Sequence, residues 1–272
     1  MLASVIITTY NRPKTLKLVL EALNYQTDRE FEVIIADDGS TKETSDMVMQ
    51  MMLTCNYPIT HVYQKDLGFR AARVRNLGAM KAKGDYLIFL DGDCIPRNNF
   101  IAMHKFLSEK KYLVCGNRVL LSEEYTKFIE DEHQQIYTYS LAKLFYVYLK
   151  GGIKRFLPLV TLKTKEKFRK LKFNWKKARS CNFALYKEDF LNVDGFDSTF
   201  EGWGYEDSDF AIRLIHSGVE IKSGRYATAC FHMYHKENDH TNERDNFSLL
   251  EDRLHSDIVK AAKGMSTIVK EE

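Results

Sequence analysis

The chain's 272 residues are 44% hydrophobic and 28% charged with a net charge of +3, the composition of a soluble globular protein with ample length for a sizeable core. Its five cysteines are odd in number and show no Cys-x-x-Cys spacing, which argues against a disulfide framework or a structural zinc site and favours a reducing compartment. Because there is no basic leader and no apolar run near the ~20 residues of a spanning helix, we expect a cytoplasmic protein that is not integral to a membrane.

Short apolar runs alternate with helical patterns through the first half of the chain. Residues 3–9 are apolar and β-branched and predict a buried strand, after which Asn11 and Pro13 open an amphipathic helix. The elements expected next are a strand in FEVIIADDGS, a strand near Thr60–Tyr63, a helix around Ala71–Ala82, a strand in YLIFLDGD and a fifth strand at 112–119. This alternation predicts an α/β fold, a mostly parallel central sheet with helices on both faces.

Polar residues follow three of these strands, at Thr8–Asn11, Asp37–Ser40 and Asp91–Asp93. Ligands of parallel sheets bind beyond the carboxyl ends of the strands. Asp91 and Asp93 can aim at one point if the backbone bends at Gly92, and hard divalent cations prefer carboxylate oxygens. The triplet therefore predicts a site for a metal ion and a diphosphate, with a turn of solvated acids as the alternative.

A second acidic pair, Asp37 and Asp38, follows the strand in FEVIIADDGS. One of these carboxylates can accept hydrogen bonds from a nucleotide base or ribose at the edge of the sheet. The alternative is an Asp–Gly turn, which is the commoner use of such a sequence.

The middle of the chain is basic and aromatic. Between Lys150 and Arg179 there are twelve Lys and Arg residues and the single acid Glu166, with aromatic and aliphatic residues interleaved. This pattern is typical of interfacial amphipathic helices, so we expect residues 150–179 to contact an anionic membrane surface. A helical lid with a solvated basic face, contact with an anionic acceptor and nucleic-acid binding are the alternatives.

The stretch GWGYEDSD places three acids at the start of a helical pattern. If the helix begins near Glu206, Asp207 shares one face with apolar residues three, four and seven positions later, and so points inward at the mouth of the helix. Asp209 and Arg213, four residues apart, predict a structural ion pair. Glu206 either bonds an acceptor hydroxyl or caps the helix.

Trp203 stands between Gly202 and Gly204 in the loop before that helix. Its ring offers a flat apolar face on which a sugar can stack, and the glycines let the loop fold over a ligand. Packing into the core is the alternative reading.

The segments SVIITTYNRP, VIIADDGST and VRNLGAMKAKGDYLIFLDGD, in this order and spacing, resemble the inverting glycosyltransferases of family 2, which have the GT-A fold. The later segment NFALYKEDFLNVDGFDSTFEGWGYEDSDFAIRL is similar to the carboxyl-terminal segment of β-1,4-galactosyltransferases and chondroitin polymerase-type transferases. Together the matching segments cover most of the chain outside roughly 120–178.

The resemblance implies roles for individual positions. The residues it implies for nucleotide-sugar binding are Thr8, Tyr10, Arg12, Asp38, Arg75, Asn76 and Asp91. Asp38 would hold the base, usually uracil in this family. Asp93 would bind Mn²⁺ or Mg²⁺ together with a histidine, and His235 is favoured over His232.

The resulting expectation is a metal-dependent inverting glycosyltransferase. It would move a hexose or N-acetylhexosamine from a nucleotide-sugar, expected to be a UDP-sugar, to a hydroxyl of a glycan or lipid-linked acceptor in bacterial surface polysaccharide or lipopolysaccharide synthesis. Asp207 would be the base, and Trp203, Gly204 and Glu206 would contact the acceptor. The alternatives are a nucleotidyltransferase, for which we find no glycine-rich phosphate loop, and a basic membrane or nucleic-acid-binding module, which leaves the acids unexplained; we expect no nucleic-acid partner.

The same expectation divides the chain into four parts. Residues 1–118 form the nucleotide-sugar half of a single GT-A domain, and 119–179 a basic, aromatic-rich helical insert. Residues 180–245 form the acceptor-binding and catalytic half, and 246–272 a C-terminal helix or tail. The basic insert would keep the protein peripheral on the inner face of the cytoplasmic membrane.

Overall fold

The computed structural model describes residues 1–165, 167–236 and 240–271. The strands are β1 (Ala3–Thr9), β2 (Phe31–Asp37), β3 (Ile59–Tyr63), β4 (Tyr86–Asp91), β5 (Cys94–Pro96), β6 (Tyr112–Cys115), β7 (Asn117–Leu120), β8 (Lys170–Lys172), β9 (Asn182–Tyr186), β10 (Glu220–Ser223) and β11 (Ala229–His232). The α-helices are α1 (Pro13–Leu23), α2 (Lys42–Thr54), α3 (Ala71–Lys81), α4 (Phe100–Leu107), α5 (Glu123–Asp131), α6 (Leu141–Leu149), α7 (Lys187–Asn192), α8 (Glu206–His216), α9 (Glu243–Leu254) and α10 (Met265–Glu271). Over the described ranges, no helix combines the length and the apolar character needed to cross a bilayer.

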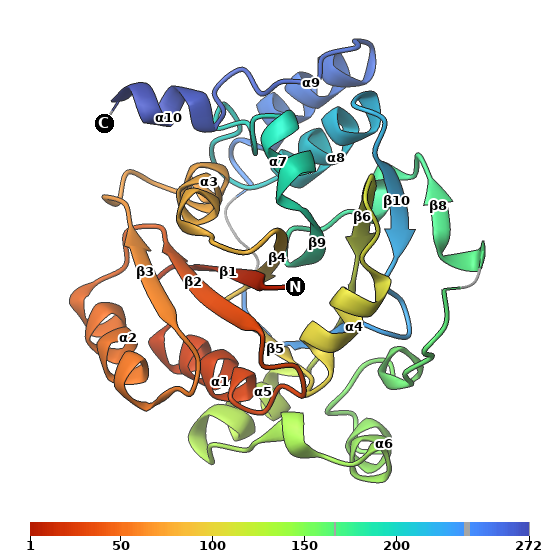
Figure 1. Cartoon of the computed structure of the whole chain (residues 1–272). Helices are drawn as coiled ribbons and strands as arrows, with labels where there is room; N and C mark the ends of the chain where they lie inside the picture. Colours follow the sequence, from red (N-terminus) through yellow and green to blue (C-terminus); the bar gives the residue numbers. More distant parts are fainter. Residues whose placement is uncertain (166, 237–239, 272) are drawn as a thin grey trace.

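Eight strands form the central sheet in the order β3-β2-β1-β4-β9-β6-β10-β8 (Figure 1). β1 runs parallel to β2 and β4, β2 to β3, and β6 to β10. β9 lies antiparallel between β4 and β6, and β8 antiparallel to β10 at the edge. A small second sheet has the order β5-β11-β7. The predicted α/β fold with a mostly parallel sheet and helices on both faces is confirmed.

The alternation of side chains along the strands builds a core on each face of the central sheet. Val5 and Ile7 pack on the face covered by α1 and α2, whereas Ile6 packs on the face covered by α3, α7 and α8 (Figure 1). That second face holds five phenylalanines with ring centroids 4.5–6.1 Å apart: Phe89, Phe183, Phe190, Phe196 and Phe210. These rings come from both halves of the chain. Their burial packs α8, which carries Phe210, against the face of the sheet formed by β4 and β9.

The expectation of one strand at 112–119 is wrong, because the chain changes sheets at Gly116. β6 ends at Cys115 in the central sheet, and β7 begins at Asn117 in the small one. Gly116 N donates to Asn182 O at 2.9 Å, and a Cβ on Gly116 would lie 2.2 Å from Asn182 Oδ1. Only glycine permits this approach, so a contact distant in sequence divides the strand.

Residues 150–179 do not form the expected amphipathic helix in the part that the structure describes. They form three single 3-10 turns, at Leu157–Leu159, Lys167–Arg169 and Trp175–Lys177, and the edge strand β8. The buried side chain of Arg169 donates at 2.6–3.1 Å to four backbone carbonyls, those of Leu162, Thr164, Ser223 and Arg225. A continuous helix would use the first two carbonyls internally, so this cation stabilises an irregular path instead.

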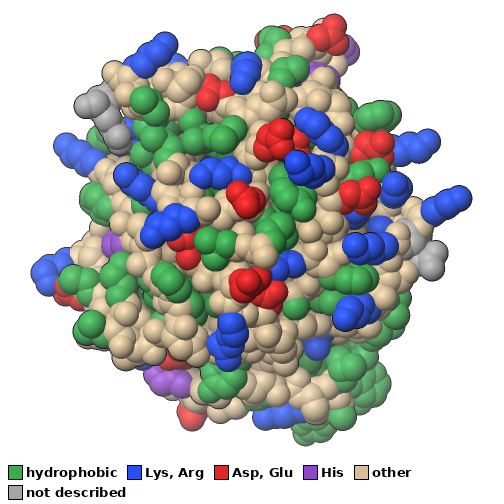
Figure 2. Space-filling model, viewed as in Figure 1, with side chains coloured by type: hydrophobic (Ala, Val, Ile, Leu, Met, Phe, Trp, Pro, Cys, Tyr) green, Lys and Arg blue, Asp and Glu red, His purple; other side chains and the backbone are tan. Residues whose placement is uncertain are grey.

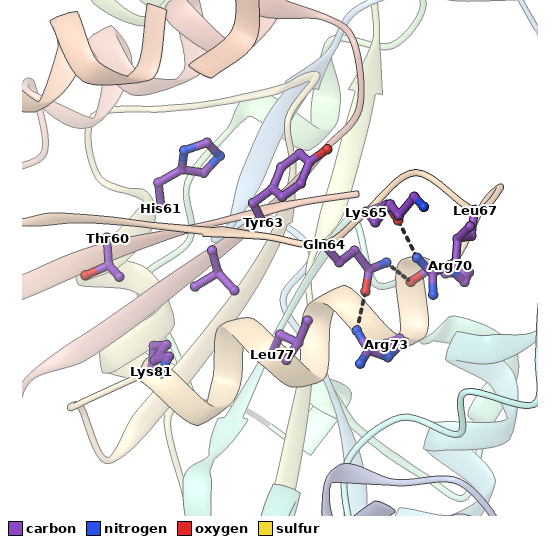
Figure 3. Close-up of a pocket in the computed structure, with 11 residues that line it drawn as sticks. Thr60, His61, Tyr63, Gln64, Lys65, Leu67, Arg70, Arg73, Leu77 and Lys81 are labelled. Carbon is purple, nitrogen blue, oxygen red and sulfur yellow. Dashed lines mark hydrogen bonds between the residues drawn. The ribbon is translucent and has the colours of Figure 1, made fainter. Parts of the chain in front are cut away.

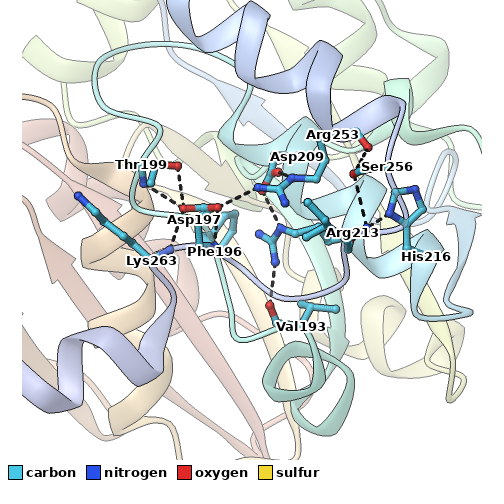
Figure 4. Close-up of polar contacts among 12 residues, drawn as sticks. Val193, Phe196, Asp197, Thr199, Asp209, Arg213, His216, Arg253, Ser256 and Lys263 are labelled. Carbon is cyan, nitrogen blue, oxygen red and sulfur yellow. Dashed lines mark hydrogen bonds and ion pairs between the residues drawn. The ribbon is translucent and has the colours of Figure 1, made fainter.

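A buried ion-pair network attaches the C-terminal helices to α8 (Figure 4). Asp209 accepts from Arg213 Nε at 2.8 Å and from Arg253 Nε at 2.6 Å, and Arg253 Nη2 lies 3.0 Å from Asp197 Oδ2. The predicted Asp209–Arg213 pair is thus confirmed, and α9 adds a second arginine to it. Since α8 begins with Glu206 and Asp207, this network also anchors the helix that carries a predicted acceptor residue and the predicted base.

Replacing Arg253 with leucine should destabilise the protein by about 3–5 kcal/mol, because it leaves Asp197 and Asp209 buried with fewer positive charges. The midpoint of urea unfolding measures the loss. The matched control is Lys42→Ala, which breaks an exposed ion pair with Asp46 and should cost less than about 1 kcal/mol. Equal midpoints for the two variants would contradict the structural role of the network.

Candidate active site

The polar residues that end β1 and β4 lie side by side. The parallel register sets Thr8 opposite Asp91, and Gly92 N then donates to Thr8 O at 2.8 Å as the chain turns. A Cβ on Gly92 would lie 3.0 Å from that oxygen, so a side chain at this position would crowd the turn. The turn presents Asp91 and Asp93 at the same end of the sheet, as the DGD spacing predicts.

Asp93 stands among basic side chains from distant parts of the chain. Its Oδ2 lies 3.1 Å from Arg12 Nη1 and 3.3 Å from His235 Nε2, and its Oδ1 lies 3.7 Å from His232 Nε2. Asp93 O also accepts from Met233 N at 3.0 Å, which ties the acid to the segment that carries both histidines. The structure therefore brings together Arg12, both predicted histidines and the acid predicted to bind metal.

The hydrogen bonds of His235 fit a cation beside Asp93. Nδ1 lies 2.7 Å from Lys236 O, and because a carbonyl only accepts, Nδ1 carries the proton. In the neutral ring, Nε2 then turns a lone pair toward Asp93 Oδ2. The Nε2 nitrogen and the Oδ2 oxygen, 3.3 Å apart, could both bind one metal ion. Carboxylate oxygen suits Mg²⁺ or Mn²⁺, and an imidazole nitrogen favours the softer Mn²⁺.

Cys94 and His232 complete this cluster. The ligand atoms of Asp93, Cys94 and His232 lie within 4.8 Å of one another. Burial raises the pKa of the Cys94 thiol well above its ordinary value, so it stays protonated and donates to Asp93 Oδ1 at 3.5 Å. Burial lowers the pKa of His232 to about 4, and Arg118 Nη1 lies 3.4 Å from its Nε2. His232 is therefore neutral at pH 7, and its Nε2 accepts the hydrogen bond from Arg118.

Arg75 joins the two halves of the site through one buried guanidinium group. Its Nε donates to Thr8 Oγ1 at 3.1 Å, while Nη2 lies 3.2 Å from Asp91 Oδ1 and Nη1 lies 3.1 Å from Glu206 Oε1. Burial raises the pKa of Asp91 and of Glu206, and the charge of Arg75 opposes the rise. One oxygen of Glu206 thus contacts Arg75, and the structure gives its second oxygen no such charged partner among the described residues.

The structure does not bring Asn76 to this cluster. Its amide exchanges two hydrogen bonds of 2.8 Å with the backbone of Phe196, and it is fully buried. Consecutive helical residues point about 100° apart, and Arg75 and Asn76 accordingly contact different groups. Asn76 positions the loop that carries Phe196, beneath the guanidinium of Arg75 at 5.5 Å.

Asp38 and Tyr10 lie at the neighbouring part of the sheet edge, toward β3. Asp38 Oδ2 accepts from Arg70 N at 2.8 Å, and Oδ1 accepts from Gln64 Nε2. Tyr10 is exposed, and its OH donates to Asp66 Oδ2 at 2.9 Å. Burial raises the pKa of Asp38. Each oxygen of Asp38 has one protein donor and keeps a further lone pair, so an additional hydrogen bond to a base is compatible with this geometry.

A cavity of about 610 Å³ opens next to these residues, along β3 and α3 (Figure 3). Gln64 and Arg70, the partners of Asp38, line it, and Gln64 Oε1 accepts from Arg73 Nη1 at 3.0 Å. The acids at Asp91–Asp93 do not line it. The cavity therefore adjoins the predicted base position and is separate from the cluster around Asp93.

Asp207 lies half-buried in the first turn of α8, which begins at Glu206 as predicted. Its Oδ2 accepts from Ser180 N and its Oδ1 from Ser208 Oγ, both at 3.3 Å. Phe210, which follows on the same face, is fully buried. Both hydrogen bonds are long, and each carboxylate oxygen keeps a lone pair that can accept a further hydrogen bond.

The loop before α8 is tied to α9. Trp203 is half-buried with its ring centroid 4.1 Å from that of His240, and Asn246 Nδ2 donates to Trp203 O at 3.4 Å. Gly202 and Gly204 adopt φ values of +75° and +112°, a region that favours glycine. The glycines thus shape a bent loop, and one face of the indole already contacts an imidazole.

Sequence reasoning gave no role to Arg118, Gln64, Asp66 or Cys94. Arg118 lies within the predicted strand 112–119, and a basic residue in this mostly apolar run could have indicated a functional side chain. Gln64 and Asp66 follow β3 and so obey the strand-end rule. Cys94 directly follows Asp93, but its proximity to His232 depends on the pairing of β5 with β11.

Comparison with known families gives two matches. The model of glycosyl transferase family 2 matches residues 4–190, and the model described as the N-terminal domain of galactosyltransferase matches residues 160–236. The first covers more than half of the chain and includes the ends of β1, β2 and β4. The second includes Asp207, His232 and His235.

Among curated relatives, the chain is 29% identical to the chondroitin synthase of Escherichia coli over 86% of this chain and 34% of the relative. It is 30% identical to the hyaluronan synthase of Pasteurella multocida, over 81% and 23% of the two chains. It is 32% identical to the validoxylamine A glucosyltransferase of Streptomyces hygroscopicus subsp. jinggangensis, over 82% and 54%. The chain thus spans between 23% and 54% of the length of these relatives.

Solved structures share the fold. S. aureus TarS 1-349 in complex with UDP superposes with a TM-score of 0.63 at 16% identity, over 98% of this chain and 68% of that one. GalNAc-T7 with UDP, GalNAc and Mn²⁺ gives a TM-score of 0.59 at 19% identity, over 86% and 43%. These neighbours have the GT-A fold, which confirms the fold that the sequence motifs imply.

Proposed function

Because the chain belongs to glycosyltransferase family 2, we propose that it is a metal-dependent inverting transferase that uses a nucleotide-sugar, with UDP as the nucleotide. The observation that carries the proposal is the convergence of Arg12, His232 and His235 on Asp93 at the carboxyl ends of the strands. Neighbours of the same fold, crystallised with UDP, UDP-GlcNAc, GDP-mannose and Mn²⁺, support it.

On the donor side, this chain's residues bind and orient a diphosphate. Asp93 with His235 or His232 would hold Mn²⁺ or Mg²⁺, which as a Lewis acid stabilises the leaving diphosphate. Arg12 and Arg118 add positive charge at the same point. Tyr10 and Asp38 would hold the base. Thr8, Asp91 and Arg75 would bind the nucleotide-sugar. Asn76 would position Phe196, whose ring lies under Arg75.

On the acceptor side, inversion requires one base on the face of the sugar opposite the leaving group. Asp207 would take the proton of the acceptor hydroxyl at a carboxylate oxygen that only Ser180 N or Ser208 Oγ now engages. Trp203, Gly204 and the second oxygen of Glu206 would position the acceptor. A protein nucleophile is unnecessary, since a single displacement inverts the anomeric carbon.

We further propose that the transferred unit is a hexose or N-acetylhexosamine and that the acceptor is a glycan or lipid-linked glycan of a bacterial surface polysaccharide or lipopolysaccharide. Relatives named as chondroitin and hyaluronan synthases support this class. The family match favours glycosyl transfer over the nucleotidyltransferase alternative. We propose the same division of the chain as the sequence predicts: 1–118 binds the donor, 119–179 is an insert, 180–245 binds the acceptor, and 246–272 is a C-terminal segment. We also propose that the protein is cytoplasmic and peripheral on the inner face of the membrane.

Titration calorimetry tests the donor half of the proposal. UDP should bind with a micromolar Kd when Mn²⁺ is present and much more weakly in EDTA, because the metal joins the diphosphate to Asp93. A panel of UDP- and GDP-sugars, scored for Mn²⁺-dependent release of the nucleotide, then identifies the donor. Equal UDP affinity with and without the metal would contradict metal-dependent binding.

A further inference from the structure

The helix α6 exposes most of its apolar side chains. In its sequence LAKLFYVYL only Leu144 and Val147 are buried, whereas Phe145, Tyr146 and Leu149 are 44%, 60% and 64% exposed. Removing leucine and phenylalanine side chains from water is favourable, so a helix that leaves several of them exposed side by side marks a partner surface.

The exposed residues continue past the end of α6. The ring of Phe156 lies 5.1 Å from that of Phe145 and 6.2 Å from that of Tyr148, and the next residue, Leu157, is 64% exposed. Figure 2 shows hydrophobic side chains gathered at the lower right of the molecule, where Figure 1 places α6. We call these residues, Phe145, Tyr146, Tyr148, Leu149 and Leu157, the α6 patch.

The chain segment that carries the α6 patch has charges of one sign. Residues 141–165 contain six Lys or Arg residues and no Asp or Glu. Lys150 Nζ lies 5.7 Å from the ring centroid of Tyr146, so one of these cations borders the patch directly. Aromatic and leucine side chains in a segment rich in lysine are the composition of protein surfaces that enter the headgroup region of anionic bilayers.

We propose that the α6 patch inserts into an anionic phospholipid surface while the surrounding Lys and Arg side chains contact its headgroups. The sequence predicted that residues 150–179 contact the membrane as an amphipathic helix. In the present proposal α6 makes the apolar contact, and the basic residues that follow α6 contact the headgroups around it. The purpose of the contact rests on the proposed function, because a lipid-linked acceptor lies in such a surface.

The α6 patch is connected to the strands of the active site. Leu121 and Ile153 form an antiparallel bridge on either side of α5 and α6, and Lys154 N donates to Leu120 O at 3.0 Å. Leu120 ends β7, where it pairs with His232 of β11. A membrane contact at α6 would therefore hold the cluster around Asp93 at a fixed distance from the bilayer.

Vesicle co-sedimentation tests this inference with the full chain. Vesicles of phosphatidylglycerol and phosphatidylcholine in equal parts should bind the wild type at least tenfold better than vesicles of phosphatidylcholine alone. Phe145→Ser with Leu149→Ser should reduce binding to the anionic vesicles at least tenfold. Lys150→Glu with Lys154→Glu should do the same at low salt, because headgroup attraction is lost.

The matched control is Met49→Ser with Leu53→Ser on α2. These side chains are also four residues apart and are 55% and 87% exposed, but α2 carries two acids and a single lysine. The control should bind vesicles like the wild type. Equal binding by the α6 and α2 variants, no preference for anionic vesicles, or self-association of the wild type that the α6 variant loses would each overturn the inference.

Failure of this inference is distinguishable from failure of the proposed function. Mn²⁺-dependent UDP binding should be the same in the wild type and in the α6 variant, which also shows that the variant folds. UDP binding without vesicle binding rejects the membrane contact alone. Vesicle binding without UDP binding rejects the proposed donor and leaves the membrane contact standing.

Discussion

Replacing Asp207 with asparagine is expected to abolish glycosyl transfer while leaving the affinity for UDP nearly unchanged. The amide keeps the shape of the side chain but cannot take a proton from the acceptor hydroxyl. General bases contribute about 10²–10⁴-fold, so kcat should fall by about 10³-fold. Transfer assays with the donor identified by the nucleotide-sugar panel measure kcat, and titration calorimetry in Mn²⁺ measures UDP affinity.

Ser208→Ala is the matched control for this experiment. It removes the hydroxyl that donates to Asp207 Oδ1 at 3.3 Å and keeps the carboxylate, so kcat should change by less than about tenfold. Two outcomes would sink the assignment. Full activity in Asp207→Asn would exclude it as the base, and loss of UDP binding in that variant would move Asp207 to the donor site.

Asp93→Asn should remove both the Mn²⁺ dependence of UDP binding and the transfer activity. Asp93 supplies the negative charge among Arg12, His232 and His235, and without it a divalent cation meets a guanidinium and two imidazoles. Loss of several kcal/mol of charge stabilisation corresponds to about a 10³-fold fall in kcat/KM. Calorimetry with UDP in Mn²⁺ and in EDTA should then give the same weak Kd.

The control for that variant is Asp66→Asn, at the same edge of the sheet but bonded to Tyr10 OH. It should keep the Mn²⁺ effect on UDP binding, because Asp66 is not among the groups around Asp93. If Asp93→Asn binds Mn²⁺ and UDP as tightly as the wild type, the metal site lies elsewhere and the proposed donor arrangement is wrong.

Local sequence signals predicted much of this fold. The strand at 3–9, the helix around 71–82 and the helix from Glu206 each depend on residues a few positions apart, and each is present. The Asp209–Arg213 pair is likewise a contact within one helical turn. The second partner of Asp209 is Arg253, 44 residues away, and a local sequence pattern cannot predict a contact over that separation.

The errors share a cause, which is that contacts between distant residues overrode local patterns. Gly116 divides the strand at 112–119 because Asn182 occupies the space next to it. The basic segment has the composition of an amphipathic helix, yet Arg169 binds the carbonyls of Ser223, at the end of β10, and of Arg225, in the loop after it, which keeps the chain irregular.

In the site, too, local patterns predicted the contacts between neighbouring strands but not the contacts between distant residues. The strand-end rule correctly grouped Thr8, Asp91 and Asp93, because parallel strands share an edge whatever the loops do. The pairing of Arg75 with Glu206 joins residues 131 positions apart and required the structure. The resemblance treated Arg75 and Asn76 as one unit, but adjacent positions on α3 point in different directions.

The antiparallel insertion of β9 beside β4 also has a consequence for synthesis on the ribosome. β4 is apolar and pairs with β1 on one side, but its other neighbour, β9, is about 90 residues further along the chain. At translation rates of about 5–20 residues per second, that edge stays unpaired for roughly 5 to 20 seconds. During this interval the nascent chain has an unpaired, aggregation-prone edge strand. The yield of folded protein in a cell should therefore depend on how well chaperones shield residues 86–91.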